Sequence, residues 1–181
     1  TEVKAGSIAI DEAHFPDKVF REQIIAEFDK DGDSVLSVDE ISKAQFLNLH
    51  DMKTISSLEG IQYLTNLQSL DVSTTSVSDL SPVKNSSLKR LDCRSSKVRS
   101  VDLTRYPNLE AFVCDNTSIN SLDVSKNEKL NTLFADSTSI SNLDVTNNPN
   151  LEQLSCSNTG LMELDVTHNP QLVTLDIGDT K

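Results

Sequence analysis

Hydrophobic positions recur at a constant interval over most of the chain. Equivalent eleven-residue stretches, the first being LQSLDVSTTSV, follow one another with the same spacing and begin at Leu67, Leu88, Leu109, Leu130 and Leu151. A degenerate 23-residue unit precedes them from Ala44, and a shortened unit, LVTLDIGDTK, follows them. Self-similarity at a fixed period of this length predicts a solenoid, in which each unit forms one coil.

Each unit contains two short alternations of apolar and polar residues. The first, LxL, predicts a short strand with both leucines inward and the residue between them outward. The second, LDV or a close variant, predicts a second short strand on the opposite wall of the coil. Because one coil cannot bury its apolar stripe alone, stacked coils must share a core. The pattern therefore predicts a right-handed superhelix with parallel short β-strands and almost no helix between repeats.

The three cysteines fall on this pattern. Cys93, Cys114 and Cys156 all occupy the sixth position of a unit, which points inward and holds Val72 and Ala135 in other units. An odd number of cysteines without a CxxC pair excludes a closed disulfide framework and a standard zinc site. We expect the cysteines to be free thiols that act as small buried hydrophobic residues.

Residues 1–43 lack the repeat and carry a helical pattern instead. In FPDKVFREQIIAEF, Pro16 suits a helix start, and apolar residues recur near helical spacing. In SVDE, Ser37 and Glu40 have the spacing of a capping box that opens a second helix. The chain is thus expected to have a helical N-terminal cap over 1–43 and an array of about 6.5 repeats over 44–181.

The stretch FDKDGDSVLSVDEI between these helices has the ligand spacing of an EF-hand calcium loop. The expected ligands are the side chains of Asp29, Asp31, Asp33, Ser37 and Glu40 and the backbone carbonyl of Val35. Ser34 stands at the sixth position, where such loops normally have glycine. Two interpretations follow: the loop binds one calcium ion despite a strain of ~1–2 kcal/mol, or the helix pair keeps the fold without an ion.

The repeat resembles a known family of bacterial proteins. Units from Leu88 onward resemble the 21-residue bacterial leucine-rich repeat, LxxLxCxxNxLxxLDV, whereas the earlier SSLEGIQYLTNLQSL and SDLSPVKN resemble internalin repeats. A helical EF-hand-like cap before such an array resembles the amino-terminal module of bacterial surface and secreted leucine-rich-repeat proteins. The resemblance implies an α/β solenoid, an extracellular or cell-surface location, and a non-enzymatic role in binding or adhesion.

One departure from the family concerns the ninth position of the repeat, where asparagine is usual. Threonine or serine stands there instead, at Thr75, Ser96, Thr117, Thr138 and Thr159. A hydroxyl group has fewer donors than a carboxamide. We therefore expect hydrogen bonds between coils at this position to be weaker than in an asparagine ladder.

The composition narrows the function further. The chain has 181 residues, a formal net charge of −12 and no tryptophan, and its charge disfavours nucleic acid and anionic membranes as partners. No apolar run approaches the length of a transmembrane helix. The three histidines are scattered, and the sequence has neither a glycine-rich phosphate loop nor an HExxH motif. These features favour a protein without enzymatic activity.

The third, fifth and seventh positions of each repeat are expected to point outward from the concave face. An apolar group beside two arginines predicts a patch that binds a protein partner. Its residues are Arg90, Arg94, Ala111, Val113, Asp115, Thr132, Phe134 and Asp136. A glycan partner is the alternative, although few aromatic rings are present to stack on sugars. A structural spacer that presents another domain, and a glycan-binding module of a larger surface enzyme, also remain open.

The shortened last unit has no further unit to cover it. Its apolar residues Leu172, Leu175 and Ile177 are expected to form an open end. An uncovered strand edge favours pairing with another chain. We therefore expect either that the natural protein continues beyond the last unit or that two copies associate end to end.

Overall fold

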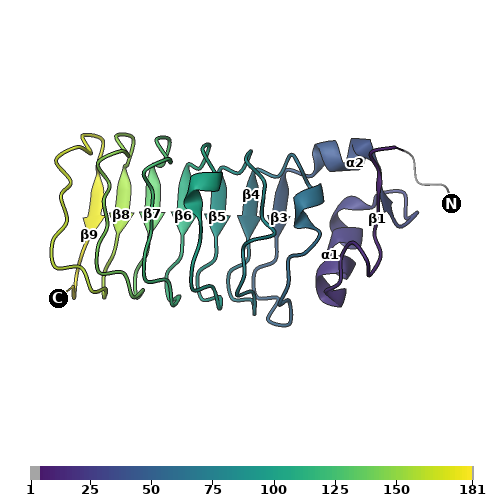
Figure 1. Cartoon of the computed structure of the whole chain (residues 1–181), viewed down its shortest axis with the longest axis horizontal. Helices are drawn as coiled ribbons and strands as arrows, with labels where there is room; N and C mark the ends of the chain where they lie inside the picture. Colours follow the sequence, from purple (N-terminus) through teal and green to yellow (C-terminus); the bar gives the residue numbers. More distant parts are fainter. Residues whose placement is uncertain (1–4, 181) are drawn as a thin grey trace.

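The computed structural model describes residues 5–180 and shows an elongated solenoid with helices at its N-terminal end (Figure 1). One seven-stranded parallel sheet runs along the molecule in the order β3 to β9. The strands are β3 (Phe46–Asn48), β4 (Ser69–Asp71), β5 (Arg90–Asp92), β6 (Ala111–Val113), β7 (Thr132–Phe134), β8 (Gln153–Ser155) and β9 (Thr174–Asp176). The sheet order equals the chain order, so each coil contributes one strand beside its predecessor.

The strand register follows from the sequence period. Leu70 of β4 pairs with Leu91 of β5, which is the equivalent leucine one repeat later, and the same offset continues to β9. Leu47 of β3 pairs with Leu70, which matches the 23-residue length of the degenerate first unit. From β3 to β8 the central residue of each strand is buried. The predicted parallel strands are therefore confirmed.

The predicted second strand on the opposite wall is wrong. Among residues 5–180, none of the segments expected on the opposite wall, at 101–103, 122–124, 143–145 and 164–166, forms part of a sheet, and the first of them leads into the short 3₁₀ helix η2 (Leu103–Arg105). The aspartate of each LDV segment instead accepts a hydrogen bond from the backbone N–H two residues ahead, at 2.8–3.2 Å. These bonds form turns that bend the backbone away from a ladder. The aspartates are Asp102, Asp123, Asp144 and Asp165.

The cysteines lie in the shared core. Cys93, Cys114 and Cys156 are free and completely buried. Burial raises the pKa of all three thiols, that of Cys156 to about 12, and nearby aspartates add to the effect. A buried thiol with a raised pKa carries almost no thiolate at neutral pH, so these residues are chemically inert. The prediction of free, buried thiols is confirmed.

The hydrogen-bonded ladder between coils lies at a different position from the one expected. The ninth-position hydroxyls donate within their own coil, as from Thr117 Oγ1 to the carbonyl of Cys114 at 2.7 Å. The ladder between coils is built from buried side chains just before each repeat: Asn85, Tyr106, Asn127, Asn148 and Asn169. Asn148 Nδ2, for example, donates to the carbonyls of Val124 at 3.0 Å and Asn127 at 2.9 Å. Each such side chain joins two successive coils.

The N-terminal helices cover one end of the solenoid. Helix α1 (Lys18–Phe28) buries Phe20, Ile24 and Phe28, and α2 (Val38–Lys43) leads directly into β3 (Figure 1). Phe15, just before α1, is completely buried against Gly60 at the start of the 3₁₀ helix η1 (Ile61–Tyr63). The apolar core is therefore continuous from the helices into the coils.

Asp17 joins the helices to the first coil. Its Oδ1 caps α1 by accepting from the backbone N–H groups of Val19 and Phe20, each at 3.1 Å. Its Oδ2 accepts from the N–H groups of Ser56 at 2.9 Å and Ser57 at 3.2 Å. Partial burial opposes ionisation, but these hydrogen bonds outweigh it and lower the pKa of Asp17.

We expect Asp17→Asn to remove part of the pH dependence of stability. The lowered pKa means that the carboxylate's contribution is complete above the unfolded pKa of about 3.9 and is lost as pH falls through the folded pKa. Solvent screening limits this contribution to about 1 kcal/mol or less. Urea unfolding followed by circular dichroism should show the variant less stable at pH 7 and equal to the wild type near pH 2. A gap that stays constant with pH would contradict this, and Asp39→Asn, whose carboxylate pairs with Lys43 on its own helix, is the control.

The last strand leaves apolar side chains exposed. Leu175 is 41% and Ile177 44% exposed at β9, whereas their counterparts one coil earlier, Leu154 and Cys156, are completely buried. Val173, at an outward position just before the strand, is 84% exposed. A further coil or a second copy of the chain would cover this end. End-to-end association stays a prediction.

Candidate functional site

The loop between α1 and α2 has a tightly organised backbone. Asp29 Oδ1 accepts hydrogen bonds from the N–H groups of Gly32 at 2.9 Å and Asp33 at 3.1 Å, and Oδ2 accepts one from Ser34 at 3.0 Å. Ser34 has a φ of 61°, in the left-handed region where the missing glycine would be unstrained. The loop therefore makes the sharp turn of a calcium loop even with serine at its sixth position.

Three of the four acidic side chains expected as ligands converge. One carboxylate oxygen from each of Asp29, Asp31 and Glu40 lies within 4.8 Å of the other two. Calcium binds oxygen at about 2.3–2.6 Å, so oxygens on opposite sides of one ion lie about 5 Å apart. Asp33 is outside this group, and its Oδ1 accepts from the N–H of Val35 at 2.8 Å. The donor set and its spacing are compatible with a calcium ion, and Asp33 lies outside this set.

The electrostatics of this cluster favour a cation. A backbone hydrogen bond from Asp33 lowers the pKa of Asp31, but desolvation and repulsion by the neighbouring carboxylates outweigh it and raise that pKa. Glu40 accepts from the backbone N–H of Lys30 at 2.7 Å and of Ser37 at 2.9 Å. These bonds overcome desolvation and lower the pKa of Glu40, so it is charged at neutral pH. Ser37 and Glu40 also form the predicted capping box of α2.

The strand at the end of the loop has a partner that the sequence did not suggest. β2 (Val35–Leu36) pairs antiparallel with β1 (Ile8–Ala9), and the N–H of Ile10 bonds to the carbonyl of Ser34 at 2.9 Å. The N-terminal segment thus provides hydrogen-bond partners for backbone groups of the loop. The side chain of Leu36 in β2 is completely buried. The alternation in SIAI was the available signal, but it is too short to predict a strand.

A second candidate surface is formed by the outward side chains of β3–β9 and the second residue after each strand, which we call the strand face. In the structure described here, no other layer covers these side chains (Figure 1). Within this face Phe134, Ala111 and Thr132 are half-buried, as are Asp115 and Asp136. The face is therefore a shallow, polar surface with one partly exposed aromatic ring at its centre.

Two expectations about the strand face need correction. Val113 is only 2% exposed, so it offers almost no apolar surface to a partner. Arg90 and Arg94 are exposed, but both donate to Asp92, whose side chain is completely buried beneath them. The predicted apolar patch beside two free arginines is therefore reduced to Phe134 and a closed arginine–aspartate cluster.

The sequence prediction also missed Phe46. This side chain is 68% exposed at the cap end of the strand face and borders a shallow hollow of about 310 Å³ with Glu27, Ser69 and Arg90. Its place in the register, opposite Ser69, is the signal that identifies it as outward.

Comparisons with known proteins bear on the fold. No protein-family model and no curated protein matches the chain. Among solved structures, an internalin (InlF) from Listeria monocytogenes superposes with a TM-score of 0.76 at 21% identity, covering 99% of this chain and 61% of that one. A leucine-rich-repeat protein from Leptospira interrogans gives a TM-score of 0.69 at 18% identity, covering 80% of this chain and 39% of that one.

The fold is an internalin-like leucine-rich-repeat solenoid. At these identities the likeness establishes the architecture alone, and the chain spans less than two thirds of either protein. Within residues 5–180 of this leucine-rich-repeat protein, no helix has the length and apolar character needed to cross a bilayer.

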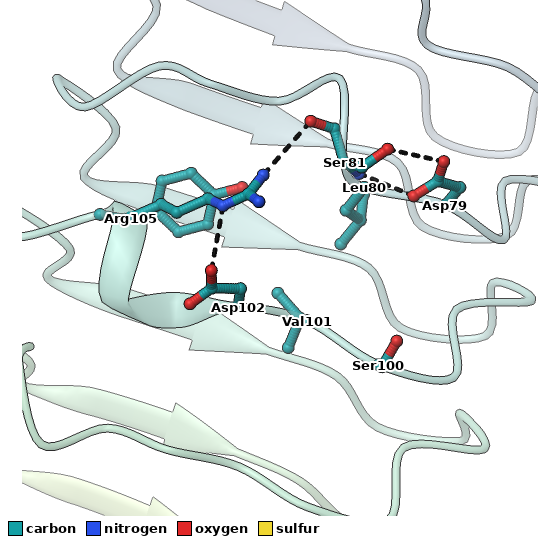
Figure 2. Close-up of a pocket in the computed structure, with 8 residues that line it drawn as sticks. Asp79, Leu80, Ser81, Ser100, Val101, Asp102 and Arg105 are labelled. Atoms are coloured by element: carbon teal, nitrogen blue, oxygen red, sulfur yellow. Dashed lines mark hydrogen bonds and ion pairs between the residues drawn. The ribbon is translucent and has the colours of Figure 1, made fainter.

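The hollow between two return segments, the stretches that connect one strand to the next, is structural. Figure 2 shows Arg105 reaching across it, with Nε bonded to Asp102 Oδ2 at 3.0 Å and Nη1 to the carbonyl of Ser81 at 3.4 Å. Ser81 Oγ in turn donates to Asp79 Oδ2 at 2.7 Å. The hollow has a volume of about 260 Å³, below the ~300–1,000 Å³ of typical ligand pockets. Its polar groups hold adjacent coils together.

Proposed function

We propose that the chain is a non-enzymatic protein-recognition module of an exported bacterial protein, and that it binds its partner through the strand face. The observation that carries this is the continuous seven-stranded sheet, whose outer side is not covered by any other element formed by residues 5–180. Polar groups on this face are fixed by neighbouring coils, so the surface is preorganised, which lowers the entropy cost of binding. Extracellular or cell-surface location and adhesion belong to this proposal, supported by the internalin-like fold.

The alternatives fit the surface less well. Typical ligand pockets are enclosed and largely apolar, whereas the hollow beside Phe46 is shallow and open to solvent. A glycan site would be expected to offer several neighbouring aromatic platforms, whereas the strand face has exposed Phe46 on β3 and half-buried Phe134 on β7, which are four strands apart. A structural spacer would leave the strand face without a binding role, which makes that alternative directly testable.

The test compares two bulky neutral substitutions. Thr132→Tyr projects a ring from the centre of the strand face, and Asn142→Tyr places the same ring on an exposed return segment between β7 and β8. Random peptides displayed on phage would be selected on the folded chain and their affinities measured on each variant. We expect Thr132→Tyr to weaken binding about tenfold or more, and Asn142→Tyr to change it less than about twofold. Equal effects, or sensitivity to Asn142→Tyr alone, would contradict the proposal.

We further propose that the loop between α1 and α2 binds one calcium ion. Asp29, Asp31 and Glu40 would supply carboxylate oxygens, with Ser37 and the carbonyl of Val35 completing the loop's expected ligands. Calcium would neutralise three carboxylates that repel one another and join the end of α1 to the start of α2. Its role would be to stabilise the cap of the solenoid.

Calorimetric titration of chelator-treated protein should show one site with a Kd of about 10⁻⁵ to 10⁻³ M, the range of weak sensor and extracellular sites. At calcium concentrations 100-fold above Kd the folded state should gain about 2.7 kcal/mol, visible as a higher melting temperature. Asp31→Ala should abolish both signals. Asp39→Ala, which removes a nearby carboxylate of α2 that pairs with Lys43, should leave them unchanged. The absence of heat and of any change in melting temperature at millimolar calcium would contradict the proposal.

A further inference from the structure

The charges of the strand face are distributed unevenly along it. Its two guanidinium groups, at Arg90 and Arg94, both lie at β5 and are bonded to buried Asp92. Four other carboxylates on the face form no ion pair with any residue in the range 5–180, and they are Asp71, Asp115, Asp136 and Asp176. Three of these four lie at β6–β9. Carboxylates without an ion pair therefore dominate that part of the face.

These three carboxylates are held in position by the face itself. Asp115 Oδ1 accepts from the backbone N–H of Asp136 at 2.8 Å. Asp136 Oδ1 accepts from Ser155 Oγ at 2.6 Å and from the N–H of Ser157 at 2.7 Å. Asp176 Oδ1 accepts from Ser157 Oγ at 2.6 Å. No donor within residues 5–180 reaches their Oδ2 atoms, so each carboxylate is fixed by one oxygen and presents the other.

The electrostatic environment of Asp115 and Asp136 favours binding of a cation. Desolvation raises the pKa of Asp115, and repulsion by Asp136 adds to this shift, which the backbone hydrogen bond from Asp136 and the attraction of Arg94 only partly oppose. A positive charge from a partner would relieve both effects. Phe134 is the last residue of β7, two residues before Asp136, and its ring is half-buried. The aliphatic stem of a lysine or arginine packs readily on such a ring while its charged end reaches a carboxylate.

We propose that the strand face over β6–β9 docks a lysine- or arginine-rich segment of a partner protein, whose cations pair with Asp115, Asp136 and Asp176 while their stems pack on Phe134. This inference rests on the proposed function and specifies the charge of the partner. Adjacent strands lie about 4.8 Å apart, so Asp115 and Asp136 can share one guanidinium group or bind two neighbouring cations. An acidic segment is disfavoured, because the arginines that would receive it are already bonded to Asp92.

The test uses peptide probes of defined charge. Labelled peptides of about twelve residues, long enough when extended to cross four strands, would alternate serine with lysine, with glutamine or with glutamate. Fluorescence anisotropy at about 50 mM salt would measure binding to the full chain, where exposed charges are only partly screened. Two triple variants carry the same loss of charge: Asp115→Asn, Asp136→Asn and Asp176→Asn on the strand face, and Asp123→Asn, Asp144→Asn and Asp165→Asn in the return segments. Thermal melting would verify that both are folded.

The lysine peptide should bind the wild-type chain. Its affinity for the strand-face variant should be about tenfold lower, and its affinity for the return-segment variant should stay within about twofold of the wild-type value. Equal weakening by both variants would reveal non-specific attraction to a chain of net charge −12 and overturn the proposal. If the chain instead prefers the glutamate peptide and Thr132→Tyr abolishes that binding, the proposal of a basic partner segment is wrong. The proposal that the strand face recognises a partner protein would still hold. If no peptide responds to any strand-face substitution, both proposals fall.

Discussion

Asn148→Asp should destabilise the solenoid by at least about 3 kcal/mol at pH 7, out of the roughly 5–15 kcal/mol typical of a domain. The amide of Asn148 is buried and donates to two carbonyls of the preceding coil, those of Val124 and Asn127. The carboxylate of aspartate cannot donate a hydrogen bond to these two carbonyl oxygens. It also places a buried negative charge next to them. Urea unfolding monitored by circular dichroism measures the loss.

The pH dependence of this variant distinguishes the charge from the missing donors. A carboxyl buried without a cation has a raised pKa, so it is protonated in the folded state at low pH. The deficit should therefore be smallest below about pH 4 and grow as pH rises from the unfolded pKa towards the folded one. Asn150→Asp is the matched control, since Asn150 is exposed and makes one bond, to the carbonyl of Glu128 at 2.9 Å. A similar loss in both variants would contradict a special role for the buried ladder.

Gly60→Ala should cost about 3–5 kcal/mol, comparable to the removal of a buried phenylalanine. Gly60 has a φ of 107°, which side-chain-bearing residues rarely adopt. A Cβ there would lie 2.3 Å from Phe15 Cδ1 and 2.6 Å from the carbonyl of His14, so the ring must leave its buried site. Loss of this contact should separate the helices from the first coil, detectable as a lower unfolding midpoint and faster proteolysis before residue 44.

Two comparisons make the interpretation specific. Gly178→Ala places a Cβ 3.4 Å from Asp176 Oδ1, an ordinary contact without positive φ, and should cost less than about 0.5 kcal/mol. Combining Gly60→Ala with Phe15→Leu should recover part of the loss, because residues in contact are energetically coupled. Additive effects of the two substitutions would argue against a direct clash.

Features of the fold that follow directly from the repeat period could be predicted from the sequence. The strand register follows from spacing alone, because a constant shift of one repeat length brings equivalent leucines together. The buried cysteines follow from the same period. The second wall could not be predicted this way, because LDV alternates like a strand while its aspartate, such as Asp144, forms a turn with the backbone two residues ahead. Periodicity does not distinguish an extended strand from such a turn.

The candidate sites depended on contacts that a linear pattern does not contain. The spacing of acidic residues identified the candidate calcium loop, but not the hydrogen bond that Asp33 accepts from the N–H of Val35. Outward positions on the strand face were expected from the alternation, yet their exposure depends on the side chains of neighbouring coils. Val113 is covered, and Arg94 is held by Asp92. The ladder was missed because Tyr106 interrupts the regularly spaced asparagines, although its hydroxyl also bonds to the preceding coil.

The constant register has a consequence for how the length of this protein can change. From β4 to β9 each strand pairs only with its neighbours, always with an offset of one complete repeat. If one whole coil is gained or lost, the remaining strands still pair with the same offset. The buried side chains of the ladder also still bond to the preceding coil in the same way. A change of one residue instead turns the inward leucines of a strand outward. The array is thus open to duplication and exchange of complete coils, which alters the extent of its recognition surface without designing a new fold.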